Sequence, residues 1–275
     1  MKNNIYSIEK IGIHNSFYIN IGGFNLRLNF CFNGIDSIRK DFINRIKSYL
    51  SGFILSKLPN KIDYTIYIKD ETRIPSLIRH NQKDFFIRLV YFGEKFCLTF
   101  YHIGIIQFQV ILIKILNLLL AKKNGFIIHC SGIVKDKKAI IFLGPPRSGK
   151  STIIKLLKSR YKIIADDSAI IRLFDKSIYV FQTPFIEKNY WFKRSFKYYS
   201  LGGIYFLKKS NNFRIYPIKN LTEITQKIMP QISTEPQNLK NTAKAVFKTI
   251  KRNKNINVLA FQKSDKILKF FEKNI

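Results

Sequence analysis

The residues best suited to chemistry lie in one short stretch near the middle of the chain. Gly144, Gly149, Lys150 and Ser151 fit the arrangement G-x-x-x-x-G-K-S. In loops of this type, backbone N–H groups surround a phosphate, and the next helix directs its positive end at the same point. The pattern predicts that Lys150 reaches the β- and γ-phosphates of a nucleotide and that the Ser151 hydroxyl binds Mg²⁺.

The remaining residues of this stretch are expected to complete the nucleotide site. Pro145 and Pro146 lack N–H donors, but they come early in the loop, and the donors are expected mostly from Arg147 onward. We expect nucleotide contacts from Gly144, Pro145, Pro146, Arg147, Ser148, Gly149, Lys150, Ser151 and Thr152.

The elements that position this loop can also be predicted. The apolar run Ala139–Leu143 before it is typical of a buried strand, and Ile153–Leu157 after it continues as a helix. The alternative is a glycine-rich turn that binds nothing. A strand before the loop and a helix after it favour nucleotide binding over that alternative.

Two adjacent carboxylates follow the next apolar strand. Asp166 and Asp167 end the run Lys162–Ala165, so both are expected near the metal and the phosphates. One carboxylate could hold Mg²⁺ while the other accepts a proton from an attacking hydroxyl. We expect Ser151 and Asp166 as metal ligands and both aspartates as catalytic residues. Adjacent carboxylates repel, which raises the pKa of one of them unless Mg²⁺ or Lys150 compensates. A solvated turn is the alternative.

His129 lies in the apolar stretch Phe126–Val134, which we expect to form one strand beside the strand that precedes the loop. A histidine near the middle of such a strand is more typical of a core residue than of a catalytic one. Cys130 should face the other side of the sheet and pack there.

The amino-terminal region shows mostly strand patterns. A hairpin is predicted around Gly22-Gly23, and His14, His80 and His102 are isolated. The expected elements are strands at Ser16–Ile21, Phe24–Phe30, Asp63–Ile68, Phe85–Phe92 and Phe96–Phe100, and a helix within Ile38–Leu58. We expect residues 1–104 to form a β-rich region packed on the core, and residues 105–275 to form a nucleotide-binding domain.

The carboxyl-terminal part alternates between strands and helices. A strand pair is predicted on either side of residues 175–177, and a second pair is expected from Gly203–Leu207 and Phe213–Ile218. The remaining expected elements are helices at Ile105–Lys123, Leu221–Ile228, Asn238–Lys251 and Asp265–Lys273, and a strand at Asn255–Phe261.

Composition limits the remaining classes. The 275 residues carry a formal net charge of +31, which suits an anionic partner but also follows from a bias toward residues with A/T-rich codons. Three separated cysteines predict a reducing compartment, and the first residues lack the pattern of a signal peptide, so we expect a cytoplasmic protein. Lys114 interrupts the apolar segment Ile103–Ala121, which we interpret as a buried helix rather than a membrane span.

Three segments together resemble a known family. They are His129–Val134, Phe142–Thr152 and Ala165–Asp167, which resemble the core of the HPr kinase/phosphorylase superfamily. Thr183–Phe185 and Gly203–Leu207 are similar to its smaller HPr kinase-like relatives. The resemblance implies an α/β fold with a mixed sheet, as in phosphoenolpyruvate carboxykinase, and an ATP- and Mg²⁺-dependent kinase.

The resemblance also assigns roles to single residues. It implies that His129 assists the base, that Lys150 holds the phosphates, and that Asp166 and Asp167 supply the metal contact and the general base, in an order that it leaves open. The family's glutamate followed by Arg-Gly is missing, so HPr is not expected as the substrate.

Several functions remain open at this point. The first hypothesis is a kinase that acts on a serine hydroxyl of a peptide or small protein. The alternatives are a small-molecule kinase for a sugar or an amino acid and an ATP-binding regulator without turnover. The basic charge leaves a nucleic-acid-dependent ATPase as a fourth alternative, although no helicase-type series of arginines and aromatic residues supports it. We expect neither membrane insertion nor a nucleic-acid partner, and the oligomeric state stays open.

Overall fold

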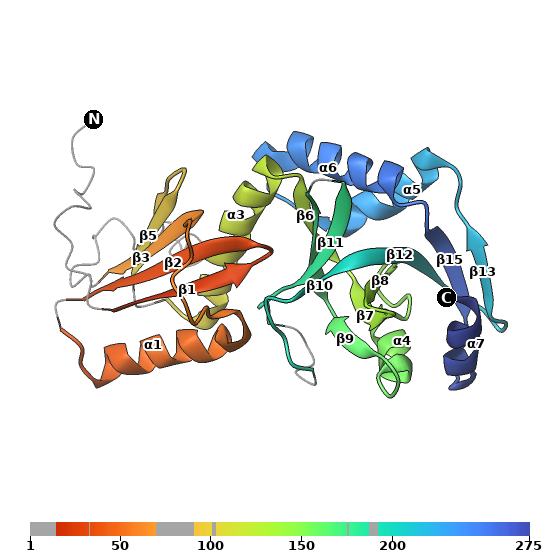
Figure 1. The fold of residues 1–275 in the computed structure, drawn as a ribbon, viewed down its shortest axis with the longest axis horizontal. Helices are drawn as coiled ribbons and strands as arrows, with labels where there is room; N and C mark the ends of the chain where they lie inside the picture. The colour runs from red at the N-terminus through yellow and green to blue at the C-terminus, as the bar shows by residue number, and fades with distance from the viewer. Residues whose placement is uncertain (1–14, 33, 70–90, 101–102, 175, 187–191) are drawn as a thin grey trace, which may run out of the picture. The chain divides into compact units, whose positions relative to one another are not determined.

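The computed structural model describes residues 15–32, 34–69, 91–100, 103–174, 176–186 and 192–275 (Figure 1). The chain divides into two compact units, Met1–Leu112 and Ile113–Ile275, and the division falls within helix α3 (Ile105–Lys122). Each unit contains one sheet with both parallel and antiparallel strand pairs. The expected α/β class with a mixed sheet is therefore confirmed.

The first unit begins with the predicted hairpin. β1 (Asn15–Ile21) and β2 (Phe24–Cys31) pair antiparallel across a two-residue turn. Gly22 and Gly23 have φ angles of 61° and 76°, the left-handed values that both central positions of this tight turn require. Glycine adopts them without a steric cost.

The rest of the first unit adds three strands in the order β1-β2-β3-β5-β4. Their bounds are β3 (Tyr64–Lys69), β4 (Tyr91–Phe92) and β5 (Phe96–Phe100), and α1 (Ser37–Tyr49) and the short helix η2 (Ser51–Phe53) connect β2 to β3. β3 runs parallel to both β2 and β5. Of the strand predicted at Phe85–Phe92, only its last two residues are described; His14, His80 and His102 lie outside the described residues.

The second unit is built on a ten-stranded sheet, in the order β14-β6-β10-β11-β12-β8-β7-β9, with β15 beside β12 and β13 beside β15. The strands are β6 (Gly125–His129), β7 (Ser131–Lys135), β8 (Lys138–Leu143), β9 (Lys162–Ala165), β10 (Ser168–Phe174), β11 (Ser177–Gln182), β12 (Tyr198–Lys209), β13 (Arg214–Pro217), β14 (Ile232–Ser233) and β15 (Ile256–Phe261). The helices are α4 (Lys150–Leu157), α5 (Leu221–Ile228), α6 (Leu239–Arg252) and α7 (Lys266–Asn274).

Strand β8 is buried on both faces because its side chains alternate between two cores. Ala139, Ile141 and Leu143 pack in the cluster that also holds the apolar residues of α5 and α6. Ile140 and Phe142 pack in the cluster that holds those of α4 and α7. Figure 1 shows these helix pairs on opposite sides of the strands. An uninterrupted apolar run is the pattern expected of such a strand.

The neighbours of β8 differ on its two sides. On one side β12 runs parallel to β8, and β15 runs parallel to β12. On the other side β7 runs antiparallel to β8, and β9 runs antiparallel to β7. β8, β9, β12 and β15 therefore all point the same way, and their carboxyl ends meet at one edge of the sheet.

Two strand predictions were wrong. The stretch Phe126–Val134 is not one strand, because the chain changes partners at Cys130: β6 pairs with β10 and β14, whereas β7 pairs with β8. His129 is thus the last residue of β6, not the middle of a strand beside β8. The second error concerns β12 and β13, which do not pair with each other because β15 lies between them.

Within the described residues, α3 is the one helix that is long and apolar enough to cross a membrane, judged by length and composition alone. Half of this segment is buried in the structure. Phe108 and Leu112 are fully buried, whereas Ile106 and Val110 are exposed, as expected for a helix that packs with one face.

Candidate functional site

The expected strand, loop and helix are present around the phosphate-binding pattern. β8 ends at Leu143, the loop follows, and α4 begins at Lys150. Gly149 precedes the helix with a φ of 104°, and Gly144 opens the loop with a φ of 154°. A Cβ added to Gly144 would lie 2.6 Å from Ser148 Oγ. Both glycines are therefore required by the backbone path, not only by the pattern.

The loop is closed by its own hydrogen bonds. The Ser148 N–H donates to the Pro145 carbonyl at 3.1 Å, and Arg147 between them is left-handed, with a φ of 65°. The carbonyl of Pro145 thus stabilises the turn, although the residue has no N–H to offer. The first turn of α4 follows directly, and N–H groups of a first turn have no partner within their own helix. Such a loop can bind an anion through backbone donors.

Lys150 is buried inside this loop. The residue is 8% exposed, and Nζ donates to the Gly144 carbonyl at 2.6 Å and to the Pro145 carbonyl at 3.3 Å. Burial lowers the pKa of the ammonium below its ordinary value, while the charges of Cys130 and Asp167 act in the opposite direction. The structure therefore places the Lys150 ammonium, whose charged form is disfavoured by burial, where the sequence predicts a phosphate.

Strand register brings the two aspartates to the same edge of the sheet. Gly132 in β7 pairs with Ile141 on one side and with Ala165 on the other, so Ile141 and Ala165 lie at one level. Asp166 and Asp167 follow Ala165 just as the end of β8 and the loop follow Ile141. Asp166 is buried, at 5% exposure, and Asp167 is half exposed.

His129 joins the aspartates at this edge. Its Nδ1 lies 3.2 Å from Asp167 Oδ1, and both side chains reach solvent. The backbone supports the contact, because the Cys130 N–H donates to the Asp167 carbonyl at 3.2 Å, and His129 is paired with Ser168 across β6 and β10. Cys130 itself is fully buried, in agreement with a packing role.

The structure thus brings two of the four predicted catalytic residues into contact, Asp167 and His129, and the charge of Asp167 raises the pKa of Lys150. Asp166 directly precedes Asp167 in the chain, and Ser151 is exposed on the first turn of α4. Among the described residues, no group of three or more histidines, cysteines or acids could hold a metal by itself. Mg²⁺ does not require such a group of side chains, since it binds through one or two protein ligands, waters and phosphate oxygens. Ser151 and Asp166 fit that pattern.

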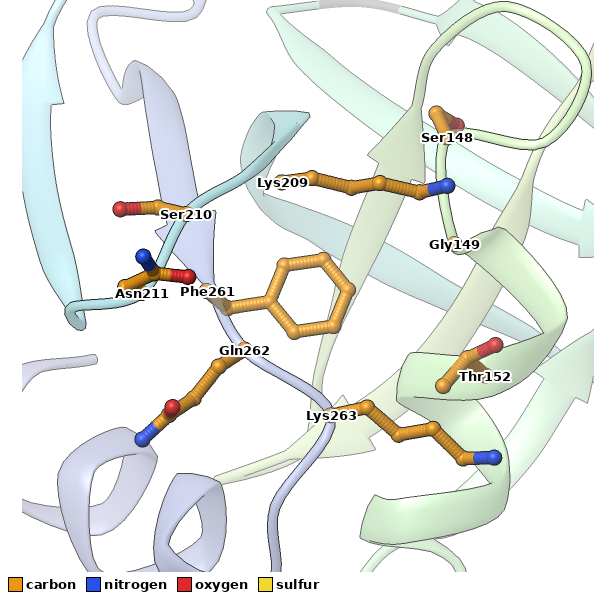
Figure 2. Close-up of a pocket in the computed structure, with 9 residues that line it drawn as sticks. All are labelled: Ser148, Gly149, Thr152, Lys209, Ser210, Asn211, Phe261, Gln262 and Lys263. Atoms are coloured by element: carbon orange, nitrogen blue, oxygen red, sulfur yellow. The ribbon is translucent and has the colours of Figure 1, made fainter.

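A pocket that the sequence did not predict adjoins the loop (Figure 2). Its volume is about 650 Å³. The residues that line this strand-end pocket are Ser148, Gly149, Thr152, Lys209, Ser210, Asn211, Phe261, Gln262 and Lys263. The signal that could have revealed it is the switch from apolar to polar residues just after β12 and β15, because ligands bind at the carboxyl ends of parallel strands.

Gly149 links the loop to the pocket, which gives a first prediction. A Cβ at this position would lie 2.8 Å from Cζ of Phe261, a core ring that is 4% exposed, and φ is left-handed as well. We expect Gly149→Ala to lower the free energy of unfolding by about 1–3 kcal/mol, as measured by urea denaturation. Gly34→Ala is the control, because a Cβ there meets nothing within 4 Å. Equal stability of the two variants would contradict the prediction.

Comparison with known proteins gives little further guidance. No protein-family model matches the chain, and no curated protein matches it. Among solved structures, it is similar to the HPr(Ser) kinase/phosphatase from Coxiella burnetii, with a TM-score of 0.31 and 11% sequence identity over 54% of this chain and 91% of that one. This similarity is weak, so the function proposed below rests on the geometry of the chain itself.

Proposed function

We propose that the protein is an ATP-dependent kinase that transfers the γ-phosphate to a hydroxyl, with serine in a peptide or small protein as the first candidate acceptor. The observation that carries this proposal is the position of Asp167. It contacts His129, and its charge acts on Lys150 inside the loop. A site that only bound a nucleotide would need the loop and the lysine, but it would not need an acid–histidine pair beside them.

The residues then divide the work as follows. The loop amides and the Lys150 ammonium bind the phosphates and stabilise the charge that develops on them. Asp167 accepts the proton of the attacking hydroxyl, whose oxygen bonds to the γ-phosphorus while the bond to the leaving ADP breaks. His129 holds the Asp167 carboxylate. Mg²⁺, when bound, supplies further charge neutralisation, and Ser151 and the buried Asp166 would hold it.

Phosphate transfer from γ-labelled ATP tests this proposal. The purified protein is incubated with labelled Mg-ATP and separate pools of serine peptides, free amino acids and sugars, and the products are identified by mass spectrometry. Label on a hydroxyl of a peptide supports the proposal in full. Label on a sugar or an amino acid supports a kinase with a different acceptor class. Nucleotide binding without transfer to any pool, even in a single turnover, would favour an ATP-binding regulator.

His129 provides a prediction of intermediate size. In His129→Gln the carboxylate of Asp167 loses the partner that positions it, while the loop is untouched. We expect kcat to fall by roughly 10- to 100-fold, as for loss of support to a general base, with little change in KM for ATP. Steady-state assays at saturating acceptor separate the two constants. A rise in KM for ATP at unchanged kcat would mean that His129 binds the nucleotide instead.

A further inference from the structure

The strand-end pocket lies at a defined place in the topology. Its residues come from the loop and the first turn of α4, which follow β8, and from the carboxyl ends of β12 and β15 and the residues just after them. β8, β12 and β15 run parallel in this part of the sheet. Crevices outside the carboxyl ends of parallel strands are the usual ligand sites of α/β sheets. The volume of about 650 Å³ lies within the range of about 300–1,000 Å³ that is typical of small-molecule pockets.

The lining has the chemistry for a ligand that is anionic at one end and planar or hydroxylated at the other. Lys209 and Lys263 are cationic, and none of the residues that line the pocket is acidic. Phe261 offers an aromatic ring, and Figure 2 shows this ring between the two lysine side chains, with Lys209 extending toward Ser148 and Gly149. Amide and hydroxyl groups of Ser210, Asn211 and Gln262 complete the lining and can bind sugar hydroxyls or base edges.

A second observation points to a ligand at the loop side of the pocket. Ser148 is 9% exposed, and its Oγ is buried with no hydrogen-bond partner among the described residues. A buried hydroxyl without a partner costs about 1–3 kcal/mol, so it is expected to have one when the site is filled. Because Ser148 belongs both to the phosphate-binding loop and to the pocket, a ligand that fills the pocket beside the loop can supply that partner.

The positions of the proposed catalytic residues determine which end of a bound nucleotide enters the pocket. Lys150, Asp167 and His129 do not line the pocket, and the aspartates follow β9, on the other side of β8 from β12 and β15. A nucleotide whose terminal phosphate faces Asp167 therefore extends its other end toward β12 and β15. Gly149 and Thr152, which line the pocket, lie between the two ends.

We propose that the strand-end pocket holds the nucleoside part of the nucleotide. The Phe261 ring forms the apolar wall against the base, Lys209 and Lys263 flank the phosphates nearest the sugar, and Asn211 and Gln262 bind the sugar hydroxyls or the base edge. The inference rests on the proposed nucleotide-binding function, and it assigns a ligand-binding role to residues 209–211 and 261–263.

Calorimetric titration with two ligands tests the inference: Mg-ATP and Mg-tripolyphosphate, which has the phosphates but no nucleoside. The full chain is expected to bind Mg-ATP at least about 10-fold more tightly, equivalent to about 1.4 kcal/mol. Asn211→Trp and Gln262→Trp each place a large side chain in the pocket without altering the loop. Both variants are expected to bind Mg-ATP no better than tripolyphosphate, while tripolyphosphate binding stays as in the unchanged chain.

Asn212→Trp is the matched control, because Asn212 is exposed, neighbours Asn211 and does not line the pocket. Equal affinity of the unchanged chain for the two ligands would overturn the inference but leave phosphate binding intact. The inference would also be overturned if both pocket variants bound Mg-ATP as tightly as the unchanged chain does, or if they lost affinity equally for Mg-ATP and Mg-tripolyphosphate. Failure of the unchanged chain to bind either ligand would overturn the proposed function together with the inference.

Discussion

Replacing Lys150 by methionine is expected to abolish phosphate transfer and to weaken Mg-ATP binding by roughly 10- to 100-fold. The ammonium is the one buried cation placed within the loop, where it bonds to the carbonyls of Gly144 and Pro145. With nucleotide bound, we expect the ammonium to donate to phosphate oxygens instead. Hydrogen bonds to charged groups contribute about 1.5–3 kcal/mol each, and electrostatic stabilisation of the transferring phosphate adds to kcat. Calorimetry gives the binding constant, and labelled ATP gives the rate.

The stability of Lys150→Met relative to the unchanged chain is expected to depend on pH in the absence of nucleotide. The pKa of Lys150 is lowered in the folded protein, so its charged form is less favourable there than in the unfolded chain. This cost is fully present below the lowered pKa, and it disappears as the pH rises past the ordinary value of 10.5. The melting temperature of Lys150→Met relative to that of the unchanged chain should therefore fall as the pH rises from neutral past 10.5.

Lys155→Met is the matched control for this experiment, since Lys155 is exposed on the same helix. It should retain both binding and transfer, and Mg-ATP should raise its melting temperature as in the unchanged chain. A Lys150→Met variant that still transfers phosphate at the normal rate would remove the loop from the mechanism.

Asp167→Asn is expected to reduce phosphate transfer by roughly 10²- to 10⁴-fold, the contribution of a general base, while Mg-ATP binding changes little. Asparagine keeps the size of the side chain and a contact with His129, but it cannot accept the proton of the acceptor. Since Asp167 raises the pKa of Lys150, the substitution should also lower that pKa further, which NMR of the labelled lysine would detect.

Two further variants make this result specific. Asp136→Asn is a neutral control, because Asp136 is exposed in the β7–β8 turn at a φ of 48°, a left-handed value that asparagine adopts readily. If Asp166 holds the metal, Asp166→Asn should also lose phosphate transfer, and it should need a higher Mg²⁺ concentration for half-maximal activity. Normal turnover in both Asp166→Asn and Asp167→Asn would end the assignment of these residues to catalysis.

The parts of the fold that depend on neighbours in sequence could be predicted. The Gly22-Gly23 hairpin, the β10–β11 pair and the strand–loop–helix around Lys150 all follow from short-range patterns of turn residues and apolar spacing. For the same reason α5 was predicted with its observed bounds: Asn220 accepts hydrogen bonds from the N–H groups of Thr222 and Glu223 and so starts the helix.

The errors share a different cause, which is pairing between distant strands. Nothing in Phe126–Val134 shows that the chain changes partners at Cys130, because both β6 and β7 are apolar. β12 and β13 are near each other in sequence, but β15, which separates them, comes about 40 residues later. The strand-end pocket was missed for the same reason, since its residues lie at or after the ends of three strands, β8, β12 and β15, that only the completed sheet brings together.

The different neighbours of β8 on its two sides have a kinetic consequence. If the nucleoside is held at the ends of β12 and β15, and the acceptor approaches Asp167 beyond β7, the two substrates share only the transferred phosphate. Neither would then block the entry of the other. Initial-rate plots should intersect, either substrate should be able to bind first, and ADP should compete with ATP alone.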